Sequence, residues 1–229
     1  GIAVTTGDRT TLVGGLAGDA ITTADGNTAV GYAALSGETG AEVNTAVGFQ
    51  ALKTQNISSG SGYNTAVGAN AGTGITTGIQ NTLIGGSAGD ALTDADQNVA
   101  IGYAALSTDT LGSTAVAIGR KALTTQNFTT ATSNYNVAIG YAAGELVTTG
   151  VRNSLIGGLS GDALTVGSYN VALGYDALSA DTQGSKNVAI GYAALDDQNF
   201  TTATDSYNTA VGYAAGSAVT TGVQNTLIG

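Results

Sequence analysis

Asn136-Val137-Ala138-Ile139-Gly140 is the stretch that decides the fold, because variants of it recur along all 229 residues. Its first position falls at residues 10, 27, 44, 64, 81, 98, 115, 136, 153, 170, 187, 208 and 225, so the step from one copy to the next is 17, apart from three longer steps of 20 or 21. That position is Asn in eleven of the thirteen copies, the fourth is always Val, Ile or Leu, and the fifth is always Gly. A fixed period of this kind is typical of solenoids and repeat arrays.

A longer period contains the short one. The third position of the string is Leu at Leu12, Leu83, Leu155 and Leu227 and Ala in every other copy, so four short repeats make one larger unit with a period of 71 or 72. Neither a linker nor a change of composition interrupts the pattern. Residues 1–229 are therefore predicted to form a single continuous array. Because it starts at Gly1 and ends in mid-pattern, we expect it to be an excerpt of a longer fibre.

The repeat length and composition together predict an all-β solenoid, a parallel β-roll or β-helix with coils of about 17 residues. Helical repeats need about 33 residues or more, and Gly, Asn and β-branched residues are weak helix formers. Coils stack at the strand spacing of about 4.8 Å, so thirteen of them give a rod about 60 Å long. The absence of Pro agrees, since every coil must donate N–H groups to its neighbour.

The alternation within the string predicts which side chains face inward. Val137 and Ile139 point one way, and Ala138 and Gly140 the other. We expect the Val and Ile side to be the core of the coil and the Ala and Gly side to be its outer wall. Small residues on an outer wall indicate close approach of another backbone, so copies of the chain are predicted to pack against each other along it.

Several repeat positions have predicted structural roles. The Asn column allows two interpretations: stacked amides that link the coils, or turn residues that tolerate positive φ. The Tyr after the Gly is predicted to cover a corner of the coil, with its ring buried, or to form a binding platform. Leu alternates with Gly farther along the coil, which lets core layers interlock. The positions taken as structural are Asn27, Gly31, Asn98, Gly102, Asn136, Ile139, Gly140, Asn187 and Gly191.

Composition excludes several functions. His and Cys are absent, so Ser–His–Asp and Cys–His catalysis and zinc sites with N or S ligands are excluded. The formal net charge is −10, which does not suit nucleic-acid binding, and no apolar run is long enough to span a membrane. The pairs Asp176 with Asp181 and Asp196 with Asp197 are interpreted as solvated turn acids. We expect no enzyme, no cofactor and no metal site.

The long repeat of each unit is predicted to form a loop that projects every four coils, about 19 Å apart. These loops suggest a second function, direct adhesion to a cell-surface or glycan receptor through repeated weak contacts. They also carry Asn-x-Ser/Thr patterns for glycosylation. A remote third function is ice binding, because the chain is rich in Thr. The candidate contact or glycosylated residues are Asn56, Asn127, Phe128, Asn199 and Phe200.

The string also resembles repeats of known fibres. Val-Ala-Ile-Gly stands at 99–102, 116–119, 137–140 and 188–191, and with the stretch 113–119 it resembles the head repeats of trimeric autotransporter adhesins. Asn-Thr-Ala-Val-Gly-Tyr-x-Ala-Leu at 27–35, and the same pattern with Phe49 in place of Tyr at 44–52, look more like fibre repeats of tailed phages and bacterial surface fibres. The autotransporter coil is shorter than the repeat of this chain.

This resemblance implies a homotrimer of left-handed β-rolls, side by side or intertwined, in a stiff rod. The rod would be extracellular, on a microbial cell surface or in a virion tail fibre. Its expected function is structural: a shaft or head segment that holds a binding tip at a distance.

Overall fold

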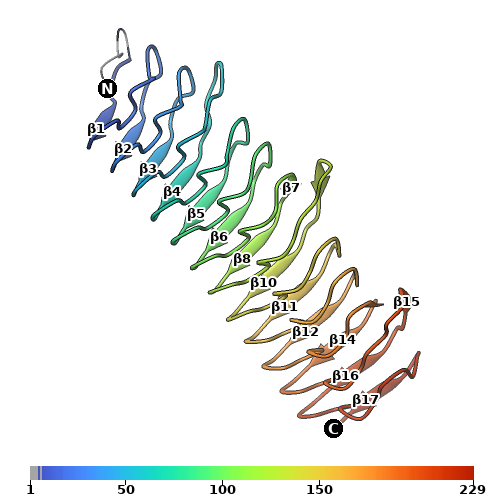
Figure 1. Cartoon of the computed structure of the whole chain (residues 1–229). Helices are drawn as coiled ribbons and strands as arrows, with labels where there is room; N and C mark the ends of the chain where they lie inside the picture. The colour runs from blue at the N-terminus through green and yellow to red at the C-terminus, as the bar shows by residue number, and fades with distance from the viewer. Residues whose placement is uncertain (1–4, 6) are drawn as a thin grey trace.

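The computed structural model describes residue 5 and residues 7–229 as a stack of similar coils, one for each repeat. Figure 1 shows that the stack is a straight rod with the strands of its long sheet in a single row along one side. Each coil contributes one three-residue strand to a 13-stranded sheet, and every strand except the two at the ends pairs with the equivalent strands of the coils before and after it. The predicted all-β parallel solenoid, with one coil for each short repeat, is confirmed.

The strands of the long sheet are short and evenly placed. They are β1 Thr11–Val13, β2 Thr28–Val30, β3 Thr45–Val47, β4 Thr65–Val67, β5 Thr82–Ile84, β6 Val99–Ile101, β8 Val116–Ile118, β10 Val137–Ile139, β11 Ser154–Ile156, β12 Val171–Leu173, β14 Val188–Ile190, β16 Thr209–Val211 and β17 Thr226–Ile228. Two further pairs each join a long coil to the coil before it: β7 Gly112–Ser113 with β9 Thr132–Ser133, and β13 Gly184–Ser185 with β15 Thr204–Asp205.

The inside and outside of the strands are the reverse of the prediction. Ala138 is fully buried inside the coil, whereas Ile139 is 37% exposed on the outer surface. In every three-residue strand from β2 to β16 the central residue is buried and its two neighbours are half-buried or exposed. The predicted Val and Ile core was therefore wrong, and these side chains form the outer surface.

The narrow interior explains the reversal. If the first residue of each string is position 1, the strand occupies positions 2 to 4 and position 9 lies across the coil. Leu123 at position 9 is fully buried and fills the space under the strand, which leaves room only for Ala117 at position 3. In the coil where position 3 is Leu155, position 9 is Gly161. A Cβ added to Gly161 would lie 2.8 Å from a methyl carbon of Leu155, so only glycine fits there. The predicted large and small layers do interlock.

The glycine at position 5 is required because the backbone of the next coil of the same chain approaches it closely. Gly102 has a φ of +135°, and a Cβ added to it would lie 2.5 Å from the carbonyl oxygen of Gly119 in the next coil. Gly31, Gly140 and Gly191 face the following coil in the same way. The backbone that approaches these glycines is therefore the next coil, and the prediction that sister chains approach them was wrong.

The Asn column links the coils from inside. Asn44 is fully buried, its backbone N–H donates to Oδ1 of Asn27 at 2.8 Å, and the Nδ2 of Asn27 donates to the Ala41 carbonyl at 2.8 Å. The same bonds recur at Asn81, Asn153 and other copies. The residue directly before each Asn, at position 17 of the short coils, has the positive φ, as at Val43. The stacked-amide interpretation is confirmed, and the alternative that Asn itself adopts positive φ was wrong.

A neighbouring side chain compensates where the column is interrupted. Ala115 has no amide to offer the next coil, and there Oδ1 of Asn134 accepts the backbone N–H of Asn136 at 2.9 Å. In the first unit the column residue is Asn44, and the residue equivalent to Asn134 is Gly62, where any Cβ would collide with the Asn44 amide. In the third unit Asn187 accepts the backbone N–H of Asn208 at 3.2 Å, and Ser206, at the position of Asn134, donates to the same Oδ1. An acceptor is therefore present in all three units.

This compensation predicts how substitutions at Asn134 and Ala115 affect stability, alone and together. Asn134→Gly should lower the free energy of unfolding by about 1–3 kcal/mol, because a buried N–H loses its acceptor. Ala115→Asn alone should also destabilise, because its amide competes with Asn134 for the same space. The double variant should recover most of the loss. Urea unfolding of all four proteins measures this, and additive losses in the double variant would contradict the interpretation.

Candidate functional site

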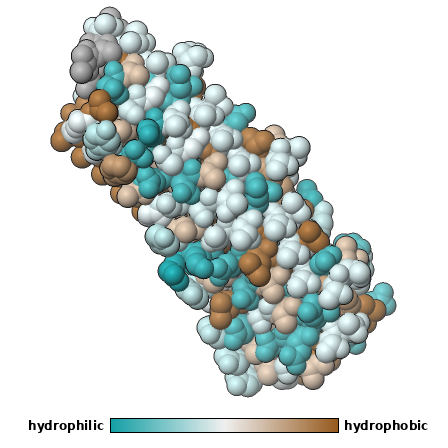
Figure 2. Space-filling view, viewed as in Figure 1, coloured by the Kyte–Doolittle hydropathy of each residue, from teal (hydrophilic) through white to brown (hydrophobic). Residues whose placement is uncertain are grey.

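The outer face of the long sheet is the largest candidate surface. It is made by positions 2 and 4 of the strands, and neither position carries a charge in any coil. Position 4 supplies Val13, Val30, Val47, Val67, Ile84, Ile101, Ile118, Ile139, Ile156, Leu173, Ile190, Val211 and Ile228, and position 2 supplies Thr, Val or Ser. In Figure 2 the side turned to the viewer is mostly pale and teal, and brown side chains gather at the margin beside β1 and β2.

The outer face is a long, uncharged strip whose area is at the upper end of the range for apolar patches on soluble monomers. Twelve steps of about 4.8 Å make it about 58 Å long, and two columns make it about 10 Å wide, so it covers about 600 Å². The largest apolar patch of a typical soluble monomer is about 300–600 Å². With its two bordering columns it reaches about 1,200 Å², more than the roughly 800 Å² that each partner buries in a standard interface.

Aromatic side chains border the outer face at position 6. Tyr192 is 48% exposed, and its ring stacks between those of Tyr175 and Tyr213 at centroid distances of 5.9 and 5.1 Å. Tyr32 and Phe49 stack in the same way at 5.7 Å. The prediction of buried corner rings was wrong, because the rings lie outside the coil and cover one another's faces.

The last residue of each coil, at position 17 of the short coils and at position 20 or 21 of the long ones, forms the opposite border, and it alternates rings with cations in the second half of the chain. The Arg152 guanidinium lies 5.9 Å from the Tyr135 ring and 5.3 Å from the Tyr169 ring. Lys186 lies 5.0 Å from the Tyr207 ring and makes an ion pair of 2.6 Å with Asp205. These cations are engaged within the chain, so they stabilise the stack of coils.

The candidate loop residues predicted from sequence differ in how exposed they are in the long coils. Asn56 and Asn199 are exposed and Asn127 is half-buried, and each Oδ1 accepts a bond from a Thr hydroxyl of the preceding coil. Phe128 and Phe200 are buried, with 6% and 7% of their surface exposed. Their rings anchor the loops in this structure, and the longest exposed run of the second loop is 129–131.

Three buried carboxylates were missed by the sequence interpretation. Glu38, Asp109 and Asp181 occupy position 12 of the second coil in each unit and are fully buried. Asp109 accepts backbone N–H bonds from Gly112 and Phe128 at 3.0 and 2.9 Å. The prediction that Asp181 is solvated was wrong. The sequence feature that could have revealed these buried acids is their spacing, which equals the period of the larger unit.

A chain of amides continues each carboxylate into the next coils. Nε2 of Gln126 donates to Asp109 at 2.6 Å, and Oε1 of Gln126 accepts from Nδ2 of Asn136 at 2.8 Å. Gln198 and Asn208 repeat this arrangement with Asp181. Every member has a partner, so this network is a structural element of the core.

Two other acids are only half-buried and less well satisfied. Oδ1 of Asp90 and Oδ1 of Asp162 are shielded from solvent and have no hydrogen-bond partner in the described chain. Burial, with smaller contributions from the negative charges of Asp176 and Glu145, raises the pKa of Asp162 to about 6. Burial also raises the pKa of Asp90. Within residues 5 and 7–229, no group of three acids lies close enough to hold a metal ion.

The raised pKa of Asp162 predicts a pH dependence of stability. The folded chain binds this proton more tightly than the unfolded chain, so the stabilising contribution is complete below about pH 4 and falls as the pH rises to about 6. Asp162→Asn should therefore have a higher melting temperature than the parent at pH 8, and the difference should disappear near pH 4. Asp197→Asn, at an exposed acid, is the control. Equal shifts in both variants at pH 8 would contradict the assignment.

No helix occurs in the described part of the chain, so none of a length that crosses a membrane is present there. Comparison with known proteins finds no matching family model, no matching curated protein and no matching solved structure.

Proposed function

We propose that this chain is a structural shaft segment of an extracellular fibre, at a microbial surface or in a virion tail, in which copies pack along the outer face. The observation that carries the proposal is the uncharged column at position 4, mostly Val and Ile, which lies on the outer surface at every level of a rod about 58 Å long, exposed in some coils and half-buried in the others. Burying it stabilises an assembly at each level by the hydrophobic effect. The sheet and the continuous core make each rod stiff.

A parallel homotrimer of left-handed coils is the proposed assembly. Three flat sheets that face a common axis enclose a triangular core, and every level adds three position-4 side chains to it. The side-chain depth of about 10 Å between packed sheets suits one residue from each face. The loops of the long coils then lie on the outside, where a shaft meets solvent.

Charged substitutions on the outer face test this function. Val47→Lys, Ile118→Lys and Ile190→Lys together place one charge on every fourth coil, and should convert the trimer to monomers because three buried ammonium groups at one level repel. The rod should stay folded, since these side chains point outward. Light scattering gives the mass and circular dichroism the fold.

A matched control carries the same three charges elsewhere. Leu146, Val166 and Val223 are exposed apolar residues away from positions 2 and 4, with 48%, 40% and 48% of their surface exposed. Their triple Lys variant should remain a trimer. If both triple variants dissociate, or neither does, the outer face is not the interface.

Ice binding is a second candidate for the same face. Thr11, Thr28, Thr45, Thr65 and Thr82 occupy position 2 of five successive coils and lie on the outer face beside the Val and Ile column. A regular flat Thr array is the feature that this function needs, and it excludes burial in a trimer. Thermal hysteresis from a monomeric rod would favour ice binding over the shaft.

A further inference from the structure

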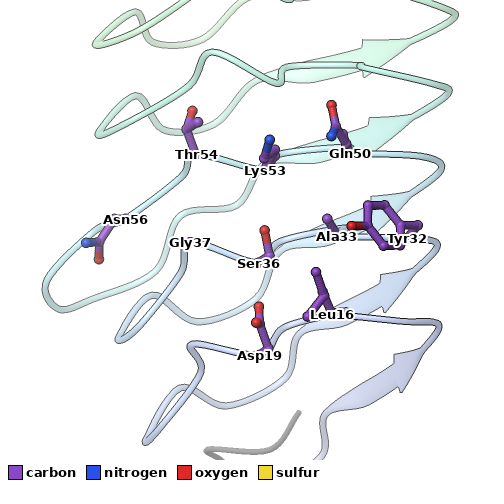
Figure 3. A pocket seen from close by; sticks show the side chains of 10 residues that line it. All are labelled: Leu16, Asp19, Tyr32, Ala33, Ser36, Gly37, Gln50, Lys53, Thr54 and Asn56. Carbon is purple, nitrogen blue, oxygen red and sulfur yellow. The ribbon is translucent and has the colours of Figure 1, made fainter.

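An open hollow of about 580 Å³ lies on the first unit, around the corner from the outer face. Figure 3 shows Leu16 and Asp19 on the first coil, Ala33 and Ser36 on the second, and Gln50 and Lys53 on the third, all on the same side of the rod. Tyr32 closes one end, and Asn56 stands apart on the long loop, turned away from the other side chains.

Small residues of the middle coil create the hollow. Ala33, Ser36 and Gly37 lie between the longer side chains of the coils on either side. Those two outer coils are two strand spacings apart, about 9.6 Å. The volume falls within the range of about 300–1,000 Å³ for small-molecule sites, and it suits a ligand the size of a disaccharide.

Four polar side chains of the hollow have no partner within the described chain. The side chains of Asp19, Ser36, Gln50 and Lys53 have no hydrogen-bond or ion-pair partner among the described residues. Asp19 offers only acceptors and Lys53 only donors, while the hydroxyl and the amide offer both. The hollow thus holds one negative and one positive group.

The equivalent positions of the other units lack this set. In the second unit Lys121 is bound to Glu145 at 2.7 Å, and Thr124 donates to the Ala104 carbonyl. In the third unit the hydroxyl of Ser179 donates to Asp196, which stands where the first unit has Lys53. The acids equivalent to Asp19 keep an unpartnered oxygen, but the combination of an unpartnered acid, hydroxyl, amide and ammonium group is found only in the first of these three units.

We propose that this hollow binds an uncharged oligosaccharide of one or two pyranose rings. Sugar hydroxyls donate and accept at once, so they can satisfy Asp19 and Lys53 together with Ser36 and Gln50. The opposite charges of Asp19 and Lys53 balance, which favours a neutral ligand over an acidic one. Leu16, 46% exposed, and the Tyr32 ring, 51% exposed, supply the apolar contact for the carbon side of the ring. A shallow site of this kind binds in the millimolar range.

The three lysines of the chain give a direct test. They are Lys53, Lys121 and Lys186, one in each unit. The full chain with ¹³C-labelled lysine is titrated with lactose, maltose and cellobiose, each to 50 mM, and the side-chain signals are followed by NMR. At least one sugar should shift the Lys53 signal with saturation and leave the other two unchanged.

Two variants and an acidic probe complete the test. Asp19→Ala should weaken the binding at least fivefold, and Asp90→Ala, at the equivalent position of the second unit, should leave it unchanged. No Lys53 shift with any of the three sugars, or equal shifts of all three lysines, overturns the proposal. Tighter binding of glucuronate than of the neutral sugars overturns the assignment of ligand class. None of these results bears on self-association, which the mass measurement decides separately.

Discussion

Gly102→Ala should abolish stable folding of the middle coils. The added Cβ would lie 2.5 Å from the Gly119 carbonyl oxygen and 3.0 Å from the Arg120 nitrogen, and neither atom can move without breaking the ladder. The φ of +135° adds strain of about 1–3 kcal/mol, and overpacking adds about 1–3 kcal/mol more. The sum approaches the total stability of many domains, about 5–15 kcal/mol. Urea unfolding and amide exchange of coils five to eight measure the loss.

Gly60→Ala is the matched control for this prediction. Gly60 also has a positive φ, +91°, but a Cβ added there meets nothing within 4 Å. It carries the backbone strain without the collision, so the loss should stay near about 1 kcal/mol. Equal losses in the two variants would mean that backbone conformation alone, and not contact between coils, requires the glycine column.

Asp109→Ala should cost about 4 kcal/mol of unfolding free energy, because it leaves three buried donors without an acceptor. These donors are the N–H groups of Gly112 and Phe128 and Nε2 of Gln126. Each orphaned donor costs about 1–3 kcal/mol. Asp197→Ala, at an exposed acid, should cost less than about 0.5 kcal/mol. Thermal and urea unfolding of the two variants provide the comparison.

Asp109→Asn distinguishes the carboxylate from a simple space-filler. Only an acid accepts on both oxygens, and this sets the direction of the chain in which Gln126 donates to Asp109 and accepts from Asn136. An amide at 109 brings two donors face to face at one of these links, so Asp109→Asn should also destabilise, by about 1–3 kcal/mol. Parent-like stability of this isosteric variant would show that the direction of donation is unimportant.

The period of the sequence repeat was enough to predict most of the fold. Thirteen copies of one string predict coils, parallel strands and their register, because equivalent residues such as Val116 and Val137 stack on each other. The string could not reveal which face of the strand is inside. Ala138 and Ile139 alternate in either case, and the choice depends on Leu123 entering from across the coil.

The surface features were harder to predict. Glu38 and Asp109 look like ordinary turn acids in sequence, because their partners Gln55 and Gln126 lie one coil away and only stacking brings them together. The hollow on the first unit arises from small residues in one coil and large ones in its neighbours, so it exists only after the coils are stacked. The Asn column was accessible from sequence because its partners are its own repeats.

The mass of the unmodified chain in solution tests the central claim most directly. We expect an assembly of three 22.2 kDa chains by native mass spectrometry and light scattering at micromolar concentration, with the outer face protected from solvent. A folded rod that keeps the mass of one chain at 100 µM would contradict this claim, because the Val and Ile column would then be a permanent surface of a solitary protein.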